Sequence, residues 1–265
     1  MEFLRSAKRR SLVSELIYVL LNVGLAVAVL IVVWAVESPL PAFALVLLSK
    51  WRVLAVRPRY WFAHVQANMV DIIVSLSLVV LLYSAGHGMS GGGMIVQIIL
   101  TMLYVGWLLL LKPRTKRSFV IAQAGVALFF GATALFGVAY GWPSSIVVVL
   151  MFIIGYASAR HVFSAYSDSD LTLMSVIWGF VMAQVGWLAF HWTIAYPIPF
   201  VEGIKIPQVA LLVVALGFAA ERIYASYSKH SVVRSVDVML PVLFTLGIII
   251  ALYFSPLNEI GLGAI

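Results

Sequence analysis

The sequence contains no cysteine and very little charge. Without cysteine, the chain has neither disulfide bonds nor thiol chemistry. Charged residues make up 10% of the 265 positions, whereas an average soluble domain carries about a quarter. So few charges cannot cover a water-facing surface, and no polar stretch is long enough to form a separate soluble domain. We therefore exclude a soluble globular protein and predict a single transmembrane domain over residues 1–265.

Long apolar runs fill most of the chain. Hydrophobic residues make up 63% of it, and its mean hydropathy is +1.08. The first run, Leu16–Val36, is too long for the core of a signal peptide, and we interpret it as an uncleaved anchor helix. Since a membrane helix needs about 20 apolar residues, we expect an all-α, polytopic transmembrane helical bundle. Its roughly nine helices lie near 16–36, 39–56, 66–85, 93–111, 118–140, 144–163, 171–190, 206–225 and 236–254.

The segment 39–56 is the weakest of these spans. Its apolar part ends at Leu48, and Lys50 and Arg52 follow. The segment is either a spanning helix whose basic side chains reach the headgroups or a half-helix that dips in and returns. If it spans, every lysine and arginine except Lys205 falls on one face. The positive-inside rule then predicts one anchor helix plus four hairpins that turn in the cytoplasm, with a cytoplasmic N-terminal segment 1–15 and an outer C-terminus.

The net charge of +7 comes from basic clusters between the apolar runs. Clusters in these places suit the anionic headgroups of a cytoplasmic leaflet rather than a nucleic acid. We therefore expect membrane lipids as partners, no nucleic acid, and a multi-pass location in the cell membrane. A protein partner within a membrane complex is compatible with the same pattern.

Charged residues beside the predicted helices form the first candidate site. Asp71, Asp170 and Asp237 stand near the starts of outward-running helices, where a carboxylate can cap free amides. Arg160 and Arg222 stand near the ends of inward-running helices, in similar Arg–aromatic–Ser sequences that fit either a duplicated hairpin or convergence at the interface. The candidate cytoplasmic-face cluster consists of Asp71, Arg160, Asp168, Asp170, Arg222 and Asp237.

Three glutamines form the second candidate group. Gln97, Gln123 and Gln184 lie inside predicted helices, where we expect midplane polar contacts. Such side chains usually form hydrogen bonds between helices. Asp168 and Asp170 have the spacing of a metal-binding pair, but two carboxylates make a poor divalent site. The five histidines lie in separate segments, so we expect no metal and no cofactor.

A glycine-rich segment before residue 93 contains Gly88-x-Ser90-x-Gly92. Together with His64 and Asn68, this segment resembles the motifs of rhomboid-type intramembrane proteases over a handful of residues. The predicted topology places His64 on the opposite face of the membrane from Ser90. A serine without a base in reach is not a nucleophile, so we predict no catalytic residue here.

Three function classes remain. A non-catalytic membrane subunit or assembly factor ranks first, because the helices carry little polar chemistry and the loops are short. A permease for an uncharged or lipid-like substrate comes second, and it rests on the hairpin repeat and the short second helix. An enzyme that acts on lipid-linked substrates at the cytoplasmic face comes third, and it rests on the acids and arginines of that face.

Overall fold

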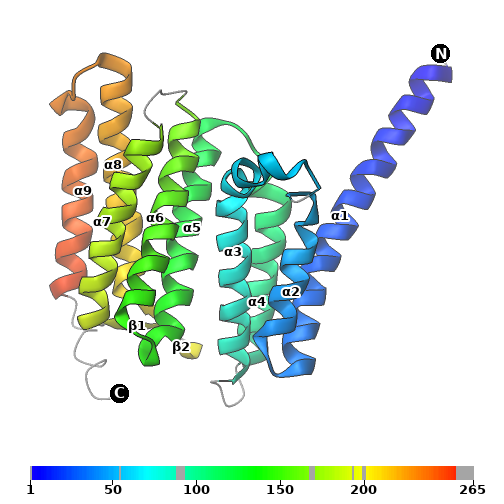
Figure 1. The fold of residues 1–265 in the computed structure, drawn as a ribbon, viewed down its shortest axis with the longest axis horizontal. Helices are drawn as coiled ribbons and strands as arrows, with labels where there is room; N and C mark the ends of the chain where they lie inside the picture. The colour runs from blue at the N-terminus through cyan, green and yellow to red at the C-terminus, as the bar shows by residue number, and fades with distance from the viewer. Residues whose placement is uncertain are drawn as a thin grey trace.

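The computed structural model describes residues 2–53, 55–87, 93–166, 171–192, 194–198 and 201–254. This part of the chain is a helical bundle with a small β-hairpin at one end (Figure 1). Its α-helices are α1 (Glu2–Val36), α2 (Pro39–Ser49), α3 (Trp61–His87), α4 (Gly93–Gly106), α5 (Arg117–Val138), α6 (Ser144–Ser164), α7 (Leu171–His191), α8 (Gln208–His230) and α9 (Ser235–Phe254). Short helical turns are η1 (Trp51–Val53), η2 (Pro58–Tyr60), η3 (Trp107–Leu111) and η4 (Ala139–Gly141).

The helices run up and down along one common direction. Within the described residues, eight of them are long and apolar enough to cross a membrane, α4 doing so together with η3. The starting end of α1 and the final end of α9 lie at opposite ends of the bundle (Figure 1). The expectation of an all-α, polytopic bundle with about nine helices is therefore confirmed.

Helix α2 is shorter than the sequence predicts. It starts after Ser38, whose side chain accepts a hydrogen bond from the Leu40 amide, and it ends at Ser49. At ~1.5 Å per residue it is only about 16 Å long. Because α1 and α3 run in the same direction, α2 and the turns that follow it return the chain to the end where α1 began (Figure 1). The predicted helical extension to Val56 is wrong, because the helix stops where the apolar run meets Lys50.

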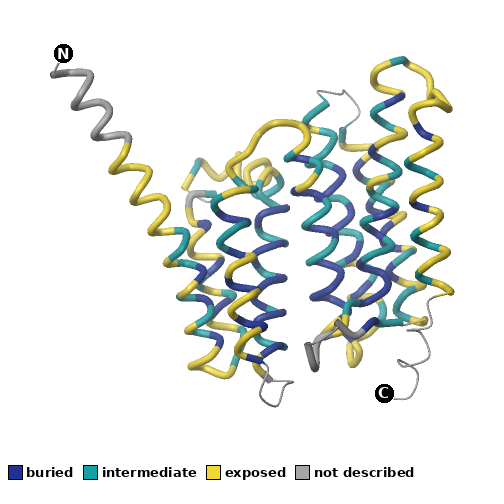
Figure 2. Tube along the Cα trace, turned by 180° about the vertical axis from the view of Figure 1, so that it is seen from behind, coloured by how far each residue is buried: buried dark blue, intermediate teal, exposed yellow. Residues whose placement is uncertain are grey.

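The interior consists of two hydrophobic cores. The first joins α1 to α4 through residues such as Val29, Val46 and Leu82. The second joins α5, α6, α7 and α8 through residues such as Met151 and Met182. Helices α3 and α5 contact each other where the two cores meet. Exposed residues cover α9 and the outer part of α1 (Figure 2), and many of them are large and apolar, which suits a surface bathed in lipid tails.

Helices α6 and α7 pack very closely because glycines line their contact. A Cβ atom on Gly155 would lie 2.5 Å from the Cβ of Met182, and one on Gly186 would lie 2.5 Å from the Cγ of Met151. Small residues that let two backbones approach are the usual basis of helix packing in membranes. The C-terminal half therefore depends on close packing at this pair.

The loop between α7 and α8 contains a hairpin that the sequence did not predict. Strand β1 (Ala195–Ile198) pairs antiparallel with β2 (Val201–Pro207), and Tyr196 stands opposite Ile206. The hydroxyl of Tyr196 donates to the carbonyl of Leu252 at 2.6 Å and accepts from Gln208 at 2.9 Å. These bonds fasten the hairpin to α8 and α9, and β-branched residues in 201–207 are the signal that favours a strand.

Candidate functional site

One end of the bundle, where α2 and η3 finish and α5 begins, carries Lys50, Lys112 and Arg117, and we call it the basic face. It holds two buried carboxylates. Asp71 lies on α3 in the N-terminal half, and Glu221 lies on α8 in the C-terminal half. A buried charge is costly unless it is paired and hydrogen-bonded, so the partners of each carboxylate show what it does.

Asp71 has a complete set of partners. Its Oδ2 atom accepts from the ammonium of Lys50, which is only 9% exposed, and lies 2.9 Å from the Nζ of Lys112. Its Oδ1 atom accepts from the indole nitrogen of Trp107 at 3.1 Å. The prediction that Asp71 caps a helix is wrong, because α3 begins at Trp61 and Asp71 lies in its interior. Asp71 instead fastens the end of α2 and the end of η3 to α3.

The turn η3 is a π-helix, and it positions two of these partners. The amide of Lys112 bonds to the carbonyl of Trp107 at 2.9 Å, which is the wide i→i+5 spacing. Residues at both ends of this turn therefore contact Asp71, and such turns are frequent at functional sites. Ser75, one helical turn further along α3, and Tyr104 on α4 are also buried.

Glu221 has an incomplete set of partners. Its side chain is only 4% exposed. The Oε1 atom accepts from the hydroxyl of Tyr166 at 2.6 Å and lies 3.7 Å from the Nη2 of Arg117. The Oε2 atom lies 3.1 Å from the Nε of Arg222 as an ion pair, but it accepts no well-aligned hydrogen bond from the described part of the chain. One oxygen of this buried carboxylate therefore has an ion pair but no hydrogen bond within the described chain.

Tyr166 lies in the turn after α6 and supports Glu221. Its hydroxyl accepts from the guanidinium of Arg117, which also stacks over its ring at 3.7 Å. Burial, helped by the hydrogen bond to Glu221, raises the pKa of Tyr166 to about 12, while Arg117 acts in the opposite direction. The phenol therefore stays protonated at physiological pH and remains a donor to Glu221.

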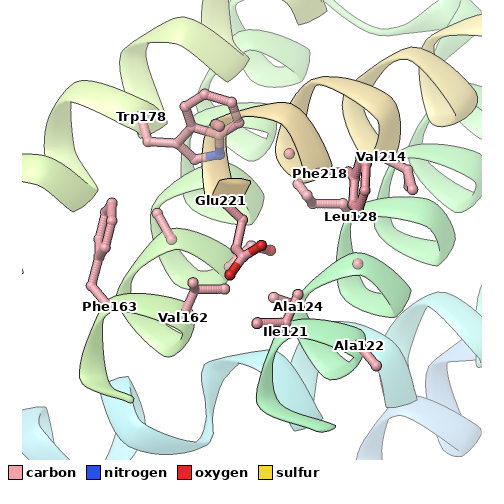
Figure 3. Close-up of a pocket in the computed structure, with 15 residues that line it drawn as sticks. Ile121, Ala122, Ala124, Leu128, Val162, Phe163, Trp178, Val214, Phe218 and Glu221 are labelled. Carbon is pink, nitrogen blue, oxygen red and sulfur yellow. The ribbon is translucent and has the colours of Figure 1, made fainter. Parts of the chain in front are cut away.

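A cavity of about 250 Å³ lies beside Glu221, between α5, α6, α7 and α8 (Figure 3). Most of its wall is apolar or aromatic. The exceptions include Ser158, which is 1% exposed and whose Oγ atom has no hydrogen-bond partner among the described residues. The apolar part of the wall includes Gly125, Leu128, Phe163, Trp178 and Phe218. An apolar cavity with a few polar groups facing it is the usual form of a small-molecule site.

The described members of the predicted cytoplasmic-face cluster have separate partners. Arg222 pairs with Glu221, whereas Arg160 donates to Thr172 at 3.1 Å on an exposed surface. Asp237 lies in the first turn of α9 as predicted, and it accepts from Ser226 at 3.1 Å. Asp168 and Asp170 lie outside the described residues, and so does Ser90.

The two Arg–aromatic–Ser segments pack against each other next to Glu221. The rings of Phe163 and Tyr224 lie 4.6 Å apart edge to face, and those of Tyr166 and Tyr224 lie 4.9 Å apart. These segments are recognisable from the sequence, whereas Glu221 is not, because adjacent residues such as Glu221 and Arg222 do not share a helix face. The long side chain of Arg222 nevertheless bends back to its neighbour.

The three glutamines are not brought together. Gln123 lies at the basic face, where it donates to the carbonyls of Leu111 and Arg114 and contacts His161 at 2.6 Å. It thereby satisfies carbonyls at the end of η3. Gln97 donates to the carbonyl of Leu82, and Gln184 is exposed on α7.

Comparison with protein-family models, with curated proteins and with solved structures gave no match. Among the residues described, no group of three or more His, Asp or Glu could hold a metal ion. The cavity has apolar walls, and one carboxylate oxygen and one hydroxyl of its lining residues lack a hydrogen bond within the described chain. Chemically, this combination can bind an amphipathic molecule whose polar end reaches Glu221 and Ser158.

Proposed function

We propose that this protein binds a lipid-like molecule in the cavity beside Glu221 and acts as a non-catalytic subunit of a membrane complex. One observation carries the proposal. The cavity is apolar along most of its wall, yet two buried polar atoms on it, from Ser158 and Glu221, lack hydrogen bonds within the described chain. A buried polar group without a partner costs about 1–3 kcal/mol, so a ligand that supplies the partner is stabilised there.

Access from the membrane supports a lipid ligand. The cavity is open to the surroundings, and Ala122 and Phe218 on its wall are exposed. A molecule dissolved in the hydrocarbon can therefore enter between helices without passing through water. Arg117 and Arg222 are 48% and 45% exposed, so the polar end of the site lies close to the headgroups.

The basic residues suggest where the protein is located and how it is oriented. We place it in the cell membrane, with the basic face in the cytoplasm, because basic residues are retained on that side. The polar end of the bound molecule then lies at the cytoplasmic leaflet. Anionic headgroups around Arg117 and Arg222 further stabilise this orientation.

Matched glycine variants on α5 test the proposal. Gly125 lines the cavity and Gly137 does not, and at both positions an added Cβ has no atom within 4 Å. Gly125→Leu should fill the cavity, so we expect native mass spectrometry of the purified protein to show at least ~10-fold less bound lipid. Gly137→Leu should retain the lipid of the wild type. Equal lipid in all three proteins would refute the proposal.

A permease for a lipid-like substrate is the second candidate. The mutual packing of the two similar segments that end α6 and α8 favours it, since repeated hairpins around a binding site are common in transporters. Reconstituted vesicles distinguish the two functions. A subunit binds the lipid without moving it between leaflets, whereas a permease accelerates its exchange in a way that Gly125→Leu abolishes.

A further inference from the structure

Two polar atoms of residues that line the cavity lack a hydrogen bond within the described chain, and they define the chemistry of the ligand's head. The carboxylate of Glu221 can only accept a hydrogen bond, whereas the hydroxyl of Ser158 can both donate and accept. They come from α8 and α6, and both lie on the same cavity. A ligand that completes this site must offer a donor to Glu221, and it gains further from an acceptor for Ser158.

The charges around Glu221 further restrict which head group the ligand can carry. Arg222 already occupies the position 3.1 Å from Oε2 where an ammonium group would bind, and Arg117 lies on the other oxygen. An amine would therefore bring a third cation to a carboxylate that two arginines already flank. A phosphate inside the apolar cavity would bring an anion against the buried Glu221, because Arg117 and Arg222 are already paired with that carboxylate and are about half exposed to the outside.

A neutral hydroxyl satisfies both atoms without adding charge. We propose that the cavity selects a lipid that ends in a hydroxyl group, such as a long-chain or isoprenoid alcohol, over an amine or a phosphate with the same tail. This inference rests on the proposed lipid-binding function. The hydroxyl donates to Glu221 and accepts from Ser158, and the apolar chain lies between the rings of Phe163, Trp178 and Phe218.

Three probes with one tail test this selectivity. Farnesol, farnesylamine and farnesyl phosphate are titrated into the full-length protein in detergent, and binding is measured by native mass spectrometry. We expect farnesol to bind at least ~10-fold more tightly than either charged analogue, because only the alcohol completes the hydrogen bonds without adding charge. Tighter or equal binding of the amine or the phosphate would overturn the inference, and so would the absence of saturable farnesol binding.

Variants of the polar atoms supply a second readout. Ser158→Ala should weaken farnesol binding by about 10-fold, the usual effect of one buried hydrogen bond. Ser175→Ala is the matched control, because Ser175 is a buried serine on α7 whose hydroxyl bonds to its own helix at Leu171. Glu221→Gln should narrow the discrimination against farnesyl phosphate, because it removes the negative charge that repels the phosphate. Unchanged selectivity in Glu221→Gln would contradict the assigned role.

The outcomes separate this inference from the function on which it rests. If Gly125→Leu loses its lipid while the wild type does not prefer farnesol, the protein binds lipid but the ligand's head is not a hydroxyl. If Gly125→Leu keeps its lipid, the cavity is not the lipid site and the proposed function itself fails.

Discussion

Asp71 and Glu221 are two buried carboxylates at the same end of the bundle. Their hydrogen-bond partners differ, and this difference distinguishes a structural carboxylate from one that can bind a ligand. Each has two cationic neighbours and one aromatic donor, which is Trp107 for Asp71 and Tyr166 for Glu221. Asp71 uses both oxygens, whereas Glu221 leaves one without a hydrogen bond beside a cavity. A carboxylate whose two oxygens both accept hydrogen bonds holds helices together. A carboxylate with one oxygen that lacks a hydrogen bond can accept one from a ligand.

The cationic partners of the two carboxylates also differ in how exposed they are. Lys50 is nearly as buried as Asp71, while Arg117 and Arg222 are about half exposed. The N-terminal half therefore depends on an ion pair that is largely buried, and this pair keeps the short helix α2 in place. The C-terminal half depends on the close packing of α6 with α7, and its charges can be altered at lower cost.

Matched amide substitutions should give the largest contrast between the two halves. Asp71→Asn leaves Lys50 buried without a counter-charge, so we expect about 3–5 kcal/mol less stability. Glu221→Gln keeps an acceptor for Tyr166 and leaves two solvated arginines, so we expect a change below about 1 kcal/mol. Equilibrium unfolding in mixed micelles measures both.

A double variant checks the cause of that loss. Replacing Lys50 with Met together with Asp71→Leu removes both charges of the buried pair, and Lys112 is exposed enough to remain solvated. Its stability should exceed that of Asp71→Leu alone, because removing one buried partner costs more than removing both. A double variant as unstable as Asp71→Leu would show that the ion pair is not what holds α2.

The packing of the C-terminal half should give an intermediate effect. Gly155→Ala places a methyl group 2.5 Å from the Cβ of Met182, so the helices must separate at a cost of about 1–3 kcal/mol. Gly137→Ala on α5 meets no atom within 4 Å and should be neutral or slightly stabilising. Thermal unfolding of both purified variants provides the measurement. Similar melting temperatures for the two would argue against packing as the basis of this half.

The smallest effect should come from Arg160→Lys. Its guanidinium makes one exposed hydrogen bond to Thr172 and does not reach Glu221 within the described contacts. Lysine keeps the charge and can extend to the headgroups, so stability should change by less than about 0.5 kcal/mol. Bound lipid, measured by mass spectrometry, should equal that of the wild type. A loss of lipid would extend the site to Arg160.

The sequence predicts the fold class well because long apolar runs have few alternative structures. It fails where partners come from distant segments. Asp71 is read as a cap from its local neighbours, yet its partners Lys50 and Trp107 are 21 and 36 positions away. Glu221 is overlooked because its neighbour Arg222 does not share its helix face, and because its other partners and the cavity come from distant helices. Local spacing also cannot show that Gln184 faces outward or that the loop after α7 forms a hairpin.

Photolabelling with a diazirine-bearing fatty alcohol tests the central contrast most directly. After irradiation of the wild-type protein in vesicles, labelled peptides are mapped by mass spectrometry with and without excess farnesol. We predict that labelling suppressed by farnesol concentrates on cavity residues of α5, α6 and α8, such as Val162 and Phe218, and is absent around Asp71. Labelling spread over the lipid-facing helices α1 and α9 that farnesol does not suppress would contradict the account.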